Sequence, residues 1–306
     1  MLAASLALGA LAVLLAWPVP IALGRAAWPR RSPAVSLLLW QCIAIAGGLS
    51  MIGALLTAGL APFGSDLIAS AVGFVRHDGR AELWHVLALC AALLLTIHLL
   101  FNLVATVVRS ERQRRRHAQL VSLLSSPLTP GARLIDSPTP VAYCLPGALS
   151  SVTVFSAGLV ELLAPDELQA VIEHERAHVV QRHDIVLVAF RAWYASLPWF
   201  PIAYRAQREV GLLIEMLADD RARRTVDRHV LARAIAIVGA AAGEPQAAGP
   251  SSVTELSDRI TRLELPPLSL VSEALVVGGV AALLGVPTVL LFAPALVGLV
   301  GLVGAA

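Results

Sequence analysis

The sequence predicts a mostly α-helical membrane protein in which transmembrane helices carry one α+β domain with a small β-sheet. Of its 306 residues, 57% are hydrophobic and only 14% are charged, whereas soluble domains carry roughly 25% charged residues. The charged residues are concentrated in a middle region, 110–267, and apolar blocks flank this region on both sides. We therefore expect a single water-facing domain of ordinary size that is anchored in a bilayer.

Three apolar blocks precede the middle region and form the membrane part of residues 1–109. They cover residues 2–24, 34–62 and 83–108, and each contains the roughly 20 apolar residues that a transmembrane helix needs. No basic residue precedes the first block and no small-residue cleavage site ends it, so we expect an uncleaved span and not a signal peptide.

The C-terminal block, residues 268–306, is apolar over nearly its whole length and admits two interpretations. In the first, residues 270–292 form one transmembrane helix. In the second, Pro287 and Pro294 divide the block into a hairpin of two short helices, because an internal proline breaks or kinks a helix. We favour one span, which gives four transmembrane helices in total.

The arginines beside the spans predict the orientation of the chain in a cell membrane. The loop after the first span contains Arg25, Arg30 and Arg31, and the segment after the third span, 109–116, contains five arginines. Because basic residues mark the cytoplasmic ends of spans, we expect the N-terminus outside and the middle domain in the cytoplasm. An arginine cluster directly after a span is typical of contact with lipid headgroups, so the expected partner is the bilayer, without direct binding of nucleic acid.

The middle region begins with a predicted small sheet over residues 132–163, where short β-prone runs alternate with proline and glycine turns. The runs are "ARLID", "PVAYCL" and "SVTVFS". A helix is then expected from Pro165, because proline suits the first turn and the acidic Asp166 and Glu167 favour the positive end of the helix dipole.

On this helix, the stretch "HERAH" carries His174 and His178 four residues apart. That spacing places both imidazoles on one face, about one turn apart, where they can bind one zinc ion. Glu175 then lies beside the metal and can take a proton from its bound water, which is the role of the glutamate in an HExxH motif. The motif alone occurs by chance in on the order of one chain in a hundred, so a third ligand is the decisive test.

A candidate for the third ligand lies in a later acidic helix, "REVGLLIEMLADDRARR", residues 208–224. Glu215 lies within an apolar run, where a carboxylate needs a partner, and it completes the three protein ligands that a catalytic zinc usually has. Asp219 follows one turn later on the same face, where it can hydrogen-bond a ligand histidine. The sequence therefore predicts one Zn²⁺ ion bound by two histidines and Glu215.

With these motifs together, residues 140–225 resemble the BlaR/MecR-type membrane zinc metallopeptidases and are more distantly similar to the HtpX and CAAX prenyl protease group. The matching stretches are "VAYCLPG", "VTVFSAGLVELL", "HERAHVVQRHD", "PWFPIAYRAQRE" and "EMLAD". In those families the last motif reads E-x-x-x-D with the glutamate as third zinc ligand, which implies that role for Glu215 and pairs it with Asp219. Three spans, a cytoplasmic protease domain and a closing span are also the BlaR-type arrangement.

The resemblance implies a zinc-dependent endopeptidase that cuts a protein or peptide substrate at the cytoplasmic face. A BlaR-type protein would cleave a cytoplasmic transcriptional repressor or its own chain, whereas an HtpX-type protein would degrade damaged membrane proteins. BlaR-type antibiotic sensors carry an extracellular penicillin-binding domain after the last span; the present sequence ends at Ala306 without one, so we expect no sensing of β-lactams by that route. A signalling or scaffold protein with an inactive zinc site is the alternative outside the enzymes.

Two further segments are expected to shape the site. Residues 185–204 are nearly long enough to span, but Arg191 and two prolines interrupt them, so we expect an interfacial or re-entrant segment that holds the metal close to the membrane surface. The stretch "VAYCLPG" is expected to form an edge strand with Tyr143 and Cys144, along which an extended substrate pairs through backbone hydrogen bonds.

Other residues near the motifs receive no active role. His183 follows the motif by about one turn, and we expect it to be a surface or helix-packing residue. Cys144 is expected to be a packed strand residue and not a nucleophile, because the HExxH motif already supplies an activated water. Arg221 and Arg223 are candidates to stabilise the reacting oxyanion, and neither is assigned.

Overall fold

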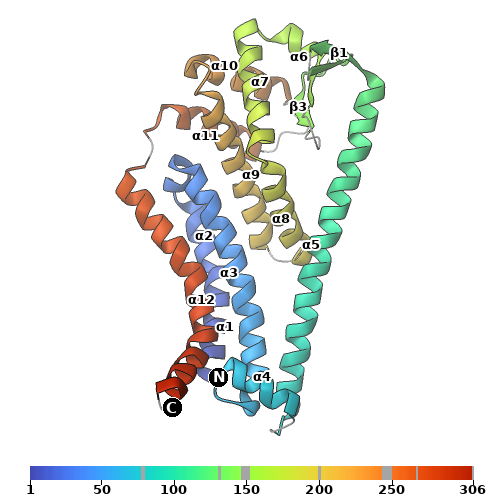
Figure 1. Cartoon of the computed structure of the whole chain (residues 1–306). Coiled ribbons are helices and arrows are strands. Elements are labelled where there is room, and N and C mark those ends of the chain that lie inside the picture. Colours follow the sequence, from blue (N-terminus) through green and yellow to red (C-terminus); the bar gives the residue numbers. More distant parts are fainter. Residues whose placement is uncertain are drawn as a thin grey trace.

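The computed structural model describes residues 1–76, 80–129, 132–145, 152–198, 201–242, 250–266 and 268–304. Parts of three predicted segments, residues 146–151, 199–200 and 305–306, lie outside these ranges. Figure 1 shows an elongated molecule in which a bundle of long helices carries a domain at one end, while both termini lie at the opposite end. The predicted fold class, a mostly helical protein with apolar helices and a small mixed sheet, is confirmed.

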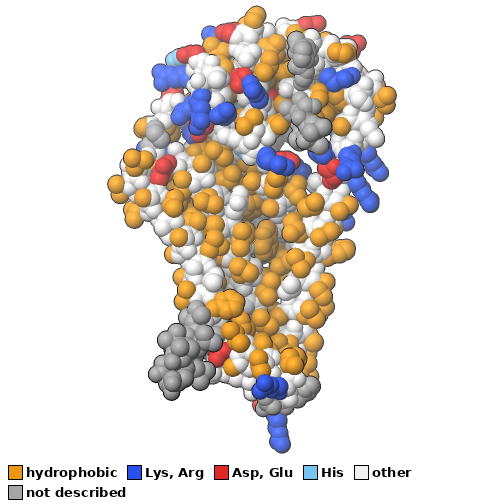
Figure 2. All heavy atoms as spheres, in the orientation of Figure 1, with side chains coloured by type: hydrophobic (Ala, Val, Ile, Leu, Met, Phe, Trp, Pro, Cys, Tyr) orange, Lys and Arg blue, Asp and Glu red, His pale blue; other side chains and the backbone are white. Residues whose placement is uncertain are grey.

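Four helical segments of the described chain are long and apolar enough to cross a membrane: Leu2–Arg25, Pro33–Phe63, Leu83–Leu124 and Leu270–Phe292. Hydrophobic side chains dominate this part of the surface in Figure 2, and most charged side chains gather on the domain above it. These helices indicate a multi-pass membrane protein. The side of the membrane that the domain faces stays a prediction.

The first of these segments is not one uninterrupted helix. It consists of α1 (Leu2–Ala16) and α2 (Pro18–Arg25), and the backbone of Trp17 between them leaves the helical conformation with φ −127° and ψ −76°. The division occurs here because Pro18 and Pro20 have no N–H to donate to carbonyl groups one turn earlier. A short 3₁₀ helix, η1 (Trp28–Arg31), then leads to the next span.

The remaining long helices form most of the bundle. After α3 (Pro33–Leu60), the 3₁₀ helix η2 (Ala61–Phe63) and the short α4 (Leu67–Arg76) lie at the end where the termini are. The third predicted span is the first part of α5 (Leu83–Leu124), which continues through the arginine-rich segment because no glycine or proline interrupts it. The C-terminal block forms α12 (Leu270–Gly304), a single helix in the described chain.

The sheet has four strands in the described residues, one more than predicted. They are β1 (Ser125–Thr129), β2 (Ala132–Ile135), β3 (Ala142–Leu145) and β4 (Val152–Ser156), in the order β1-β2-β4-β3. β2 and β4 run parallel, and the other two pairs are antiparallel. β1 escaped prediction because its serines and Pro127 do not favour strands, although an edge strand tolerates proline. β3 forms the opposite edge, beside the helices of the domain.

Helices α6 to α11 complete the described part of the domain and link it to the bundle. Their bounds are α6 (Ala157–Leu162), α7 (Pro165–Val180), α8 (His183–Ser196), α9 (Pro201–Ala222), α10 (Arg228–Ala242) and α11 (Pro250–Glu264). α7 begins at the predicted Pro165, and Glu167 Oε2 accepts a hydrogen bond of 3.0 Å from the Ala164 N–H. This capping contact fixes where the helix starts.

Two hydrophobic cores hold the molecule together, and α9 belongs to both. The core of the bundle contains Trp40 of α3, Phe190 of α8 and Leu213 of α9. The core of the domain contains Phe155 of β4 and, at the end of α9, Ala222. A displacement of α9 would therefore disturb both cores, which makes this helix a firm support for any side chain on its free face.

The predicted interfacial segment, 185–204, forms most of α8 and the start of α9. Figure 1 shows both helices reaching from the domain into the bundle, where α8 packs against α5 and α9 packs against α3. Near the lower end of α8, His98 Nε2 of α5 donates to the Ser196 carbonyl at 3.0 Å. Insertion of this segment into the bilayer stays a prediction.

Candidate metal centre

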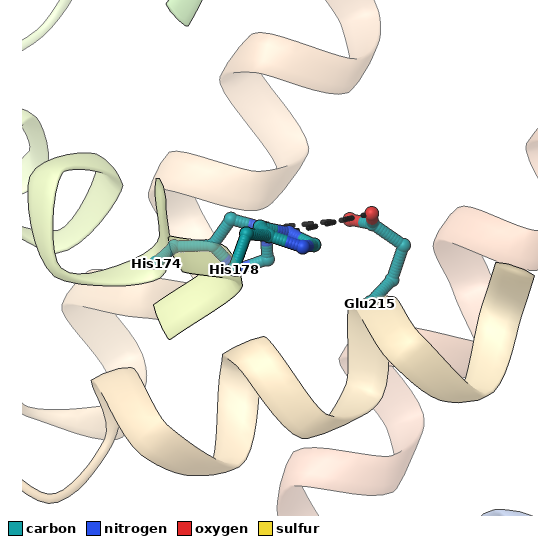
Figure 3. A group of neighbouring side chains, drawn as sticks. All are labelled: His174, His178 and Glu215. Carbon is teal, nitrogen blue, oxygen red and sulfur yellow. Dashed lines mark hydrogen bonds and ion pairs between the residues drawn. The ribbon is translucent and has the colours of Figure 1, made fainter. Parts of the chain in front are cut away.

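Helices α7 and α9 bring three metal-binding side chains together. His174 and His178 project from one face of α7, and Glu215 of α9 points toward them (Figure 3). The Nε2 atoms of the two histidines lie 3.2 Å apart, and the Glu215 carboxylate oxygens lie 3.3 Å from His174 Nε2 and 3.5 Å from His178 Nε2. These donor atoms are close enough to hold one metal ion.

The local sequence of α9 explains why Glu215 faces the histidines. Its neighbours Leu213, Ile214 and Met216 are each at most 3% exposed and therefore turn the apolar faces of the helix into the cores. Glu215 keeps 39% of its side chain exposed, because it lies on the remaining face, toward a cavity. An acid inside an apolar run is thus directed to the site by the burial of its neighbours.

Asp219 lies one turn after Glu215 and contacts the first histidine from behind. Its Oδ1 atom is 2.9 Å from His174 Nδ1, the ring nitrogen on the side away from Glu215. The Asp219 side chain is only 1% exposed. A buried carboxylate in this position orients the imidazole and fixes which ring nitrogen carries the proton.

Arg259 of α11 belongs to the same cluster, although the sequence interpretation missed it. Its guanidinium donates to both oxygens of Asp219, at 2.9 and 2.8 Å, and its Nη1 lies 3.2 Å from Glu215 Oε2. The two arginines considered from the sequence lie elsewhere: Arg223 pairs with Asp220, and Arg221 lines a separate surface pocket. The available signal was indirect, because a buried carboxylate such as Asp219 requires a cation as partner.

His183 was expected to be a surface or helix-packing residue, and the structure agrees with the second alternative. It is only 3% exposed, and its Nδ1 lies 3.0 Å from His178 Nδ1, a contact with the motif that the sequence did not predict. Arg182, which separates α7 from α8, adopts a left-handed conformation with φ 51° and thereby sets the direction in which α8 starts at His183. Each histidine of the motif therefore has a partner on its Nδ1 side.

The two carboxylates of the cluster are held in their ionised forms. Burial would raise the pKa of Glu215, but the hydrogen bond and charge of His174 and the charge of Arg259 outweigh it and lower this pKa to about 2. Burial likewise opposes the ionised form of Asp219, and hydrogen bonds from His174 and Arg259 hold its pKa well below the usual range. Both carboxylates are therefore ionised at neutral pH, and Arg259 together with a protonated His174 ring balances their two charges.

The two motif histidines differ in their protonation. Burial alone would lower the pKa of His174, but hydrogen bonds to Asp219 and Glu215 outweigh it and raise this pKa to about 10. Burial lowers the pKa of His178. It also lowers the pKa of His183 to about 4, and the adjacent His178 acts in the same direction. A bound cation would add its own charge to this balance.

Glu175 faces the cavity beside the three candidate ligands. Burial raises its pKa to about 7, the charge of His174 opposes this shift and the charge of Glu215 adds to it. A hydrogen bond from the Cys144 backbone acts in the lowering direction. A carboxylate with a pKa near 7 can accept and release a proton at neutral pH, which suits a general base.

Strand β3 carries Tyr143 and Cys144 along the edge of the sheet. The Tyr143 ring lies 5.0 Å from the ring of His117 on α5, and Cys144 Sγ lies 3.0 Å from Thr153 Oγ1 of β4. Burial raises the pKa of the Cys144 thiol, so this cysteine is a poor nucleophile. Because Val141 accepts a hydrogen bond from the β4 side, the backbone groups of Cys144 turn toward the free edge.

Comparison with known proteins supports a peptidase. Residues 108–210, about a third of the chain, match the profile of Peptidase family M48, and this segment contains His174, Glu175 and His178 but ends before Glu215. No curated protein and no solved structure matches the chain significantly. The family match and the apolar helices together support a membrane-associated metallopeptidase, a hydrolase that acts on peptide bonds.

Proposed function

We propose that this protein is a membrane-embedded zinc-dependent endopeptidase that cleaves protein or peptide substrates at the cytoplasmic face of the membrane. The observation that carries the proposal is the convergence of His174, His178 and Glu215, whose donor atoms lie 3.2 to 3.5 Å apart. Two ligands at 2.0–2.1 Å from a tetrahedral zinc ion stand about 3.3 Å apart. Two imidazoles and one carboxylate are also a donor set of catalytic zinc, which leaves a position for water.

Zinc in this site would act as a Lewis acid and lower the pKa of a water molecule toward neutrality. Glu175 would take the proton of that water and pass it to the leaving amine, since its own pKa lies close to neutrality. Asp219 would hold the His174 ring in the orientation that binding requires, and Arg259 would hold both carboxylates in place. The free edge of β3 would pair with the extended substrate.

The substrate class has two candidates, each with an observation in its favour. Regulatory cleavage of a transcriptional repressor, or of the chain itself, follows from the resemblance of "VAYCLPG" and "PWFPIAY" to BlaR-type proteins. Turnover of membrane proteins is favoured by a groove of about 1040 Å³ between α5 and α8. This groove extends from Leu103, on the apolar part of α5, to Cys144 on the edge strand proposed to bind the substrate.

The first test is the Glu175→Gln variant of the full-length protein. We expect it to bind zinc like the native protein and to lose about 10²- to 10⁴-fold of its proteolytic rate, because the proton acceptor is removed and the ligands remain. Glu173→Gln is the matched control, since this glutamate lies on the same helix and contacts Arg176 instead of the site. Undiminished cleavage by Glu175→Gln would remove this residue from its proposed role.

The second test distinguishes the two substrate classes and the scaffold alternative. Peptide termini are compared between cells that produce the native protein and cells that produce Glu175→Gln. New termini in one cytoplasmic protein or in this chain itself would indicate regulation, and new termini in many membrane proteins would indicate turnover. Bound zinc without any difference in termini would favour a non-catalytic metal site.

A further inference from the structure

A cavity of about 200 Å³ lies beside the metal centre, and its two sides differ in chemistry. One side is formed by polar groups of the site: His174, Glu175, Glu215 and Arg259. The other side is apolar and comes from three helices: Val171 of α7; Leu231, Ala234, Ile235 and Val238 of α10; and Leu256 of α11. The sequence interpretation assigned no role to α10 or α11.

The apolar side of the cavity is continuous with the core of the domain. Leu231 and Ala234 are at most 1% exposed, whereas Val238 and Leu256 pack against that core but are only partly buried. The latter two therefore present apolar surface that the described residues do not cover. A group that covers this surface gains free energy if it is apolar, because it removes the surface from water.

The size of the cavity exceeds what the reaction needs for its water. Its volume of about 200 Å³ is well above the roughly 10–15 Å³ that one water molecule requires by the same measure. Ordered water needs two to four polar partners, and α10 and α11 offer none on the apolar side apart from Arg259. The space is thus suited to a branched or aromatic side chain rather than to a cluster of waters.

Charge also restricts what can occupy the cavity. Arg259 already binds Asp219 through two hydrogen bonds and contacts Glu215, so its guanidinium is not free to select an acidic side chain. The carboxylates of Glu175 and Glu215 on the same side would repel one. An apolar side chain fits because it needs none of these groups.

The depth of the cavity is set by a close contact between α10 and α11. A Cβ atom at Gly239 would lie 2.7 Å from two methyl carbons of Leu256, so the glycine allows Leu256 to pack directly against α10. Ala142 of the edge strand also lines the cavity. A peptide paired along β3 would therefore pass beside the cavity.

We propose that this cavity is a specificity pocket, which receives an apolar side chain of about leucine or phenylalanine size from a residue that flanks the cleaved bond. The inference rests on the proposed peptidase function and adds a substrate class to it. It assigns substrate selection to α10 and α11, the part of the domain that lies beyond the segment matched by the peptidase family.

Two substitutions change the pocket in opposite directions. Val238→Phe fills it and should shift preference toward substrates with alanine or glycine at the selected position. Leu256→Ala enlarges it and should shift preference toward larger aromatic residues. Since one methylene in a hydrophobic pocket changes the rate ratio about 10- to 200-fold, we expect each variant to change the ratio of kcat/KM values for small and large side chains at least about tenfold.

The measurement is mass spectrometry of a peptide library that the purified full-length protein cleaves in the presence of zinc. Ala240→Leu is the matched control, because Ala240 lies on α10 and is exposed outside the cavity. Opposite shifts in the two pocket variants and none in the control would support the pocket. Cleavage with the same preference in all variants would overturn it and leave the peptidase function intact.

A binding measurement keeps the inference independent of turnover. In the Glu175→Gln background, fluorescence anisotropy compares matched peptides that contain alanine, leucine or phenylalanine at the selected position. We expect leucine or phenylalanine to bind about tenfold more tightly than alanine, and Val238→Phe to abolish the difference. Equal binding of the three peptides would overturn the pocket, whereas selective binding without cleavage by the native protein would overturn the peptidase function alone.

Discussion

The two histidines of α7 lie one turn apart, yet the chain supports them in different ways. His174 is held from the domain side by Asp219, a buried carboxylate that in turn binds Arg259 of α11. His178 is held from the side of the bundle by His183, the first residue of α8. The support of His174 is a charged carboxylate that accepts two hydrogen bonds from Arg259. The support of His178 is a single contact between two imidazoles.

This difference shows that a symmetric sequence motif can form an asymmetric site. The charged support raises the pKa of His174 to about 10, whereas burial lowers the pKa of His178. A metal must therefore displace a proton from His174, while His178 already presents a neutral ring. The support of His178 also connects the site to the bundle, because α8 packs against α5.

The largest expected effect comes from removing the cation of the charged support. Arg259→Ala removes the guanidinium that binds both oxygens of the buried Asp219 and leaves it only the contact with His174. Breaking a buried pair costs about 3–5 kcal/mol. We expect the free energy of unfolding of the domain to fall by this amount in chemical denaturation of the purified protein. Arg233→Ala is the control, because Arg233 is 61% exposed beside Asp166, and such a surface pair contributes about 0–1 kcal/mol. Equal losses in both variants would contradict the charged support.

A smaller effect is expected when the carboxylate is neutralised but its shape is kept. Asp219→Asn weakens the contact to His174 Nδ1, and loss of such a partner typically lowers metal affinity 10- to 100-fold. We expect the upper part of this range, measured by competition with a zinc chelator. Asp220→Asn is the matched control, because Asp220 pairs with Arg223 and Arg262 and contacts neither histidine. An unchanged zinc affinity in Asp219→Asn would show that His174 does not depend on this carboxylate.

The sequence identified the side chains that could hold a metal more readily than the side chains that contact them. His174, Glu175 and His178 are fixed by helical spacing within five residues, and the family match spans this stretch. Glu215 was accessible because an ionised group within an apolar run needs a partner, and its distance of 3.3 Å from His174 agrees with that argument. Both inferences used patterns within a single helix, which do not depend on how distant elements pack.

The supports depend on how distant elements pack, and sequence patterns do not carry this information. Arg259 binds Asp219 although the two residues are 40 positions apart in the sequence. From the sequence alone, many other arginines of the domain are equally plausible partners. His183 depends on the left-handed conformation of Arg182, which a non-glycine residue adopts rarely. Strand β1 was not predicted for a similar reason: its pairing with β2 overrides the weak preference of its residues for strand structure.

The smallest effect is expected on the side of the bundle. His183→Ala removes the contact to His178 Nδ1, and we expect zinc affinity to fall about tenfold, the lower limit for an outer partner, because this contact involves no ionised group. His183→Gln keeps an amide that can bond to the ring, so it should recover most of the affinity. The exposed His229 provides the control for loss of a histidine that could bind zinc nonspecifically. A loss in His183→Ala as large as in Asp219→Asn would remove the asymmetry, since both histidines would then depend on their partners to the same degree.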